Sequence, residues 1–82
     1  MNHSLPPPPS PTELSILAAA TSLCLVLDGQ LPRDFPALQA AADRALISIG
    51  LPRIHPSAVL PIWTTASKLI QDPEICPLLL HP

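Results

Sequence analysis

The chain has 82 residues, of which 48% are apolar and only 12% are charged, so it forms at most one domain. Its net charge is −2 with only four Lys and Arg residues, which excludes strong nucleic-acid binding because that requires a basic patch to neutralise phosphates. Phe35 and Trp63 are the only aromatic residues, so the chain also lacks a platform for stacking bases.

The apolar content is too high for the size of the domain. Mean hydropathy is +0.39, and a domain this small buries only a little over half of its unfolded surface. We therefore expect part of the apolar surface to be covered by a second copy, a partner or a membrane.

Residues 1–9 are rich in proline, and Pro6–Pro9 predict an extended polyproline II segment that cannot join a helical core. We expect a disordered tail over residues 1–9 and a single helical domain over residues 10–82. The tail is either a ligand for an aromatic groove or a stiff leader, and the absence of a flanking arginine favours the leader. It has no basic segment of the kind that begins a secretory signal.

The first helix is predicted over residues 11–27. Ser10 is a suitable N-cap, Pro11 suits the first helical position and Glu13 completes a capping box. Gly29 suits the left-handed residue after the helix end. The run Leu14–Leu27 is too short to span a membrane, which takes about 20 residues. Because the helix is apolar nearly all round, we expect it to be the central helix of the domain or the core of an oligomer.

The second helix is predicted over residues 35–49, with Asp34 as its N-cap and Gly50 at its end. Its apolar residues recur at spacings of three and four: Phe35, Leu38, Ala42, Ala45, Leu46 and Ile49. The polar residues Gln39, Asp43 and Arg44 lie away from that stripe.

The start of the third helix has two solutions because Pro56 and Pro61 lie close together. Ser57 could cap a helix that tolerates Pro61 in its fourth position. Alternatively, residues 56–59 form a separate turn and the helix begins at Pro61, which we favour. In both cases the residues expected to face the core are Ile62, Ala66, Leu69 and Ile70, with Trp63 beside them.

A short fourth helix is predicted after Asp72-Pro73-Glu74, with Pro77 interrupting it before Leu78–Leu80. No segment alternates apolar and polar residues as a strand does. The fold class is therefore all-α, a small bundle of three helices plus a short fourth.

The motif Leu-Pro-Arg-x-x-Pro occurs at residues 31–36 and again at residues 51–56, each time shortly after a glycine. We interpret both copies as loops that end one helix and start the next. A simple up-down-up bundle puts the two arginines at opposite ends of the second helix, about 20 Å apart. Arg53 has no acidic neighbour in sequence. We favour a solvated loop arginine; the alternative is that Arg53, alone or with Arg33, contacts an acidic group of a partner or an anionic ligand.

No pattern of catalytic or metal-binding residues is evident. The histidines have no ligand spacing, and His55 is interpreted as a loop or cap residue. Cys24 and Cys76 are interpreted as small buried apolar residues, since a disulfide between them would need an oxidising compartment. We therefore expect a protein that is not an enzyme and uses no cofactor or metal.

These observations predict a cytoplasmic, non-catalytic helical module for protein–protein interaction, such as a small adaptor, regulator or accessory subunit, that contacts a partner or forms a homodimer. The alternative is a small membrane-associated protein that uses residues 14–27 or the C-terminal leucines. The candidate interface residues are Leu17, Leu23, Leu27, Trp63, Leu78, Leu79 and Arg53.

Overall fold

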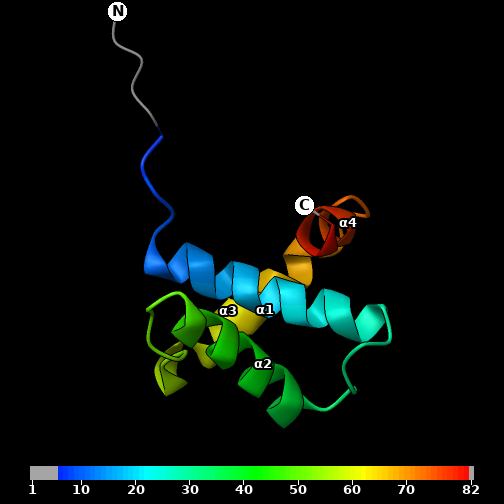
Figure 1. The fold of residues 1–82 in the computed structure, drawn as a ribbon, viewed down its shortest axis with the longest axis horizontal. Helices are drawn as coiled ribbons and strands as arrows, with labels where there is room; N and C mark the ends of the chain where they lie inside the picture. The colour runs from blue at the N-terminus through cyan, green and yellow to red at the C-terminus, as the bar shows by residue number, and fades with distance from the viewer. Residues whose placement is uncertain (1–5, 82) are drawn as a thin grey trace, which may run out of the picture.

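The computed structural model describes residues 6–81 and is built from helices joined by short loops (Figure 1). The elements are α1 (Pro11–Leu27), α2 (Phe35–Ser48), a single 3-10 turn η1 (Pro56–Ala58), α3 (Val59–Leu69) and α4 (Ile75–Leu80). Residues 6–81 contain no strand, so the predicted all-α class is confirmed.

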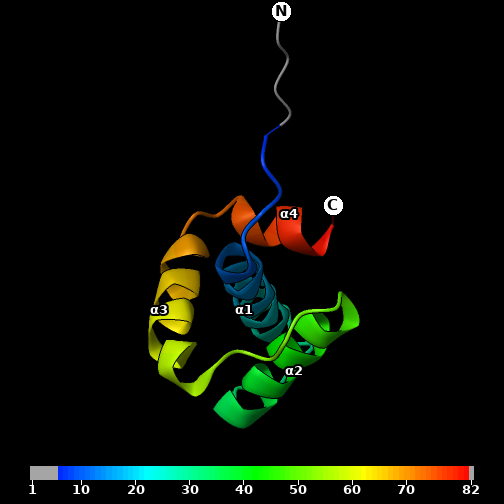
Figure 2. The same ribbon diagram turned by 90° about the vertical axis from the view of Figure 1, so that its left-hand side faces the viewer.

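The helix α1 lies at the centre, and α2, α3 and α4 each pack against it (Figures 1 and 2). Figure 2 shows α3 on one side of α1, α2 on another and α4 above it. Fully buried alanines occur in three helices: Ala19 and Ala20 in α1, Ala42 in α2 and Ala66 in α3. Such small side chains let helix backbones approach closely. The predicted central position of the first helix is confirmed.

The start of α1 follows its sequence signal. The Ser10 hydroxyl accepts a hydrogen bond from the Glu13 amide at 3.2 Å, and Pro11 occupies the first turn. Residues 6–10 are exposed and have no regular secondary structure. The remainder of the predicted proline-rich tail, residues 1–5, lies outside the described residues.

Both glycines end helices in the left-handed conformation, with φ of +79° at Gly29 and +86° at Gly50. After α2, the Leu51 amide donates to the Leu46 carbonyl at 2.9 Å and the Gly50 amide donates to the Ile47 carbonyl at 3.0 Å. These two bonds define a Schellman motif. The same pair of bonds closes α1, where the Gln30 amide reaches the Leu25 carbonyl at 2.8 Å.

The repeated motif is therefore confirmed as a pair of helix-to-helix loops. Its two leucines, Leu31 and Leu51, pack back against the core. Leu51 directly follows Gly50 and makes the hydrophobic contact of a Schellman motif, whereas Leu31 lies one residue beyond that position.

The third helix differs from both sequence solutions. A separate turn, η1, does precede it, but α3 begins at Val59 rather than at Pro61. Pro61 lies in the first turn, where its missing amide hydrogen loses no helical bond. Ser57 does not cap α3, because it lies within η1. The Nδ1 atom of His55 accepts the Ser57 amide at 3.1 Å and caps that turn.

The short fourth helix is also displaced from its prediction. Pro77 does not interrupt α4 but occupies its first turn, because the helix begins at Ile75. The Asp72 carboxylate accepts the Glu74 amide at 3.0 Å, so it stabilises the turn before α4 rather than capping the helix.

A chain of polar contacts joins α2 to α3. The Trp63 indole donates to the Gln39 side-chain oxygen at 2.6 Å, and the Gln39 amide nitrogen lies 3.1 Å from both oxygens of Asp43. Asp43 in turn accepts the Ile54 backbone amide at 2.9 Å. Phe35 meets the Trp63 ring edge to face, with ring centroids 5.4 Å apart.

Gln39 and Asp43 lie outside the apolar stripe, yet they are not merely solvated. Both side chains are partly buried, and together they satisfy the polar groups of a buried tryptophan and of the chain before η1. The physical reason is that Trp63, once buried, requires an acceptor for its N–H group.

We predict that Gln39→Ala lowers the free energy of unfolding by about 1–3 kcal/mol, because it leaves the Trp63 N–H without its acceptor. Urea unfolding followed by Trp63 fluorescence measures this loss. The matched control is Gln71→Ala on the exposed surface, which is expected to change stability by less than about 0.5 kcal/mol. Equal stability of the two variants would contradict the bridging role of Gln39.

Candidate functional site

The side-chain types that bind metals are dispersed over the part of the chain that the structure describes. Within residues 6–81, no group of three or more His, Cys, Asp and Glu residues is arranged to hold a metal ion. Across the same residues, no cysteine is left with a free thiol.

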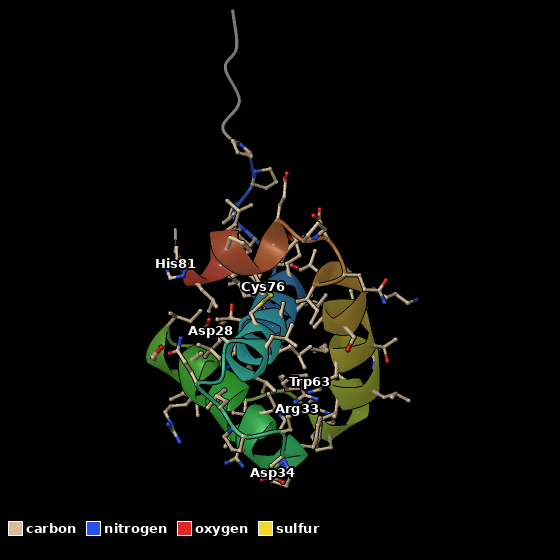
Figure 3. All side chains as sticks on the ribbon, turned by 90° about the vertical axis from the view of Figure 1, so that its right-hand side faces the viewer. Asp28, Arg33, Asp34, Trp63, Cys76 and His81 are labelled. Atoms are coloured by element: carbon tan, nitrogen blue, oxygen red, sulfur yellow. A yellow bond between two sulfur atoms is a disulfide. The ribbon has the colours of Figure 1, made fainter. Side chains whose placement is uncertain are left out.

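Cys24 in α1 and Cys76 in α4 form a disulfide, with their Cα atoms 5.3 Å apart (Figure 3). This Cα separation lies within the normal range for a disulfide. The interpretation of the two cysteines as unpaired buried apolar residues is therefore wrong. The sequence did not reveal the pairing because 52 residues separate the cysteines, and only the return of α4 onto α1 brings them together.

The disulfide is the strongest attachment of α4. This helix has only six residues, has no side-chain N-cap bond, and packs on α1. Leu79 packs against the core, whereas Leu78 is 63% exposed. Beside the disulfide lies a shallow hollow of about 240 Å³, lined by Leu27 and His81 among others.

A larger apolar hollow lies between α1 and α2, and we call it the α1–α2 groove. Its volume is about 350 Å³. It is lined by Leu14, Leu17, Ala18, Thr21, Ser22 and Leu25 of α1 together with Ala41, Ala45, Leu46 and Ser48 of α2 and its C-cap residue Ile49. All of these side chains are apolar or small hydroxyl residues, so the lining carries no charge.

The groove exists because α1 is apolar nearly all round while its neighbours cover only part of its circumference. The side that carries Leu14, Leu17, Thr21 and Leu25 remains open. Leu17 is 38% exposed, and Ile49 on the α2 wall is 59% exposed. The groove therefore contains part of the apolar surplus that composition indicates.

The candidate interface residues do not form a single surface. Leu17 lines the α1–α2 groove, but Leu23 and Leu27 line a different hollow of about 340 Å³ near Phe35. Trp63 is only 7% exposed, so its side chain is buried in the core and presents little surface to a partner. The remaining three are apart from the groove: Leu78 and Leu79 in α4, and Arg53 in the loop before η1.

Sequence reasoning missed the α2 wall of the groove. Ala45 and Ile49 were assigned to the core-facing stripe, yet both are exposed and line the groove. Periodicity alone gave no signal of this, because Leu46 in the same stripe is buried at 1% exposure.

The two arginines of the repeated motif lie in different hollows. Arg33 lines the hollow near Phe35, and Arg53 lines another of about 180 Å³ beside Thr12 and Ser15 in the first turns of α1. The 14-residue α2 separates their loops, which corresponds to about 20 Å at 1.5 Å per residue. A shared site for one small anion is therefore not formed.

Comparison with known proteins does not assign the chain to a family. No family model matches it, and no curated protein or solved structure is significantly similar. Among residues 6–81, no helix is both long enough and apolar enough to cross a membrane.

We predict that Cys24→Ala combined with Cys76→Ala lowers the free energy of unfolding by about 4 kcal/mol. This is the chain-entropy estimate for a bridge whose ends are 52 residues apart. Urea unfolding measures the loss, and reduction of the unmodified protein with dithiothreitol is the matched control. Hydrogen exchange is expected to accelerate most in α4. Unchanged stability, or unchanged exchange in residues 75–80, would contradict this tethering role.

Proposed function

We propose that the protein is a non-catalytic helical interaction module that buries its α1–α2 groove against a helix of another protein chain. The observation that carries the proposal is the groove itself, an uncharged apolar hollow of about 350 Å³ between two helices. Exposed apolar surface of this kind typically marks an interface.

The shape of the groove favours a helix as the occupant. Its lining combines the small side chains Ala18, Ala41 and Ala45 with larger exposed ones such as Leu17 and Ile49. An amphipathic helix that lays its apolar face into such a groove is a recurrent mode of recognition.

Membrane association through residues 14–27 or the C-terminal leucines has less support. Most of the circumference of α1 is already packed against α2, α3 and α4. Its remaining open side is a concave groove, which fits a convex helix better than a flat lipid surface.

The disulfide bears on the compartment in which the module acts. The expected cytoplasmic location is disfavoured because cytosolic thiols are kept reduced. We therefore propose that the protein acts in an oxidising compartment.

Thiol alkylation of protein isolated from its native source under denaturing conditions tests this placement. We expect neither Cys24 nor Cys76 to be alkylated before reduction, and both to be alkylated after it. Alkylation of both cysteines without reduction would place the protein in a reducing compartment.

The interaction proposal predicts that Leu17→Asp abolishes binding, because it puts a charge into the apolar groove. The matched control is Leu60→Asp in α3, since Leu60 is 77% exposed and does not line the groove. The unmodified protein and the two variants are compared by sedimentation equilibrium at micromolar concentration and by affinity purification from the native source. Helical circular dichroism and Trp63 emission verify that each variant is folded.

Association that survives Leu60→Asp but is lost in Leu17→Asp is the expected result. A monomeric chain with no partner that depends on Leu17 would overturn the proposed function.

A further inference from the structure

We propose that the Cys24–Cys76 bridge is a thiol-exchange site, at which an external dithiol attacks the Cys76 sulfur in the folded protein and thereby releases α4 from α1. This inference goes beyond the proposed function and does not depend on the α1–α2 groove. Three observations carry it: the hollow at the bridge, the unequal burial of the two cysteines and the few contacts that hold α4.

The bridge can be reached from the surface. Both Cys24 and Cys76 line the hollow of about 240 Å³ beside α4, together with Leu27, Leu80 and His81 among others. Figure 3 shows the sulfur–sulfur bond where α4 lies on α1. A thiol that enters this hollow contacts the bridge directly, whereas a bridge enclosed in a core reacts only after the protein unfolds.

The two cysteines are not equally buried, and this difference selects the sulfur that is attacked. Cys24 is only 1% exposed, whereas Cys76 is partly exposed. Thiol–disulfide exchange requires the attacking thiolate to contact one sulfur while the other departs, so its direction depends on access. The exposed sulfur of Cys76 is therefore the point of attack, and the buried sulfur of Cys24 is the one that leaves.

The exchange has two steps. In the first, one thiolate of the dithiol forms a mixed disulfide with Cys76 and breaks the bond to Cys24, which leaves as a thiolate and takes up a proton from water. In the second, the other thiolate of the dithiol attacks the reagent sulfur of that mixed disulfide, closes a ring and expels the Cys76 thiolate, which is also protonated. The bridge gains the electrons and protons that the dithiol loses as it is oxidised to a disulfide.

Little besides the bridge holds α4 in place. It has six residues, none of them buried, and Leu79 is its one side chain that packs against the buried cluster. Within residues 6–81, no hydrogen bond joins α4 to another helix, since its backbone bonds run to residues 72–77. A helix this short is not stable alone in water, so α4 is expected to leave α1 once the bridge opens.

The other helices have contacts that do not involve α4. Both α2 and α3 pack on α1, and the polar contacts from Trp63 through Gln39 to Asp43 join them to each other. Opening the bridge therefore uncovers the side of α1 that carries Cys24 and leaves the arrangement of α1, α2 and α3 in place.

Brief exposure of the oxidised full-length protein to glutathione, a monothiol, tests the point of attack. N-ethylmaleimide stops the exchange and labels the sulfur that has left, and mass spectrometry of peptides locates both groups. We expect glutathione on Cys76 and maleimide on Cys24 at least about tenfold more often than the reverse. Equal labelling, or a preference of glutathione for Cys24, overturns the assignment.

The dependence of the rate on urea shows whether the folded protein reacts. The bridge is reduced with dithiothreitol at urea concentrations below the unfolding transition, and free thiols are measured over time. Attack through the hollow is expected to change in rate by less than about twofold over this range, because every folded molecule presents the hollow. A rate that rises in proportion to the unfolded fraction, which increases steeply with urea, overturns the proposal.

Two tryptophan variants test the route of entry. Leu80→Trp narrows the hollow that Leu80 lines, so we expect it to slow reduction by dithiothreitol at least about fivefold. The matched control is Leu78→Trp, since Leu78 is 63% exposed and does not line the hollow, and it is expected to leave the rate unchanged. Circular dichroism verifies that both variants are folded. Equal rates in the two variants would exclude the hollow as the route.

The release of α4 is measured at Cys24, which is 1% exposed while α4 is in place. In the reduced protein, we expect iodoacetamide to modify Cys24 at a rate within about tenfold of that of Cys76, because both thiols are then accessible. Trp63 emission is expected to stay that of the folded protein. A Cys24 thiol that remains protected while Cys76 reacts, or unfolding of the whole chain on reduction, contradicts the release of α4 alone.

Discussion

Apart from Glu13 in the first turn, the side chains of α1 are apolar or small, and a helix of that composition is stable in water only when other structure covers it. The arrangement of the other helices follows from this requirement. Two helices of ordinary length, α2 and α3, pack on it, and the short α4 covers part of what remains. Buried alanines at these contacts keep the layers close, so a chain of this size can still bury a continuous core.

Because α2 and α3 pack mainly on α1, further contacts are needed to fix their positions relative to each other. Here the polar contacts that run from Trp63 through Gln39 to Asp43 provide that link between α2, α3 and the loop before η1. Hydrogen bonds are directional, whereas apolar packing against α1 would tolerate a slide along its axis. Every member of this set has a partner, and among residues 6–81 no buried side-chain polar atom is left without one.

Most caps and stops, which depend on neighbouring residues, could be predicted from the sequence, although the start of α3 at Val59 and the place of Pro77 inside α4 were not. Features that depend on distant residues could not be predicted. The cap at Ser10 and the stops at Gly29 and Gly50 are local, and each was predicted correctly. The Trp63–Gln39 hydrogen bond joins residues 24 positions apart, and the Cys24–Cys76 bridge joins residues 52 positions apart. No local sequence pattern predicts either of them. Composition indicated uncovered apolar surface, but only packing determines which side of α1 stays open.

The bridge between Cys24 and Cys76 has a topological consequence. It closes residues 24–76 into a covalent ring that contains all of α2 and α3, while α1 joins that ring only near its last turn. Most of α1 is thus an arm that emerges from the ring and lies at the centre of the helices the ring carries. The part of α1 on which the core depends is held there by packing alone, because the covalent closure begins after it.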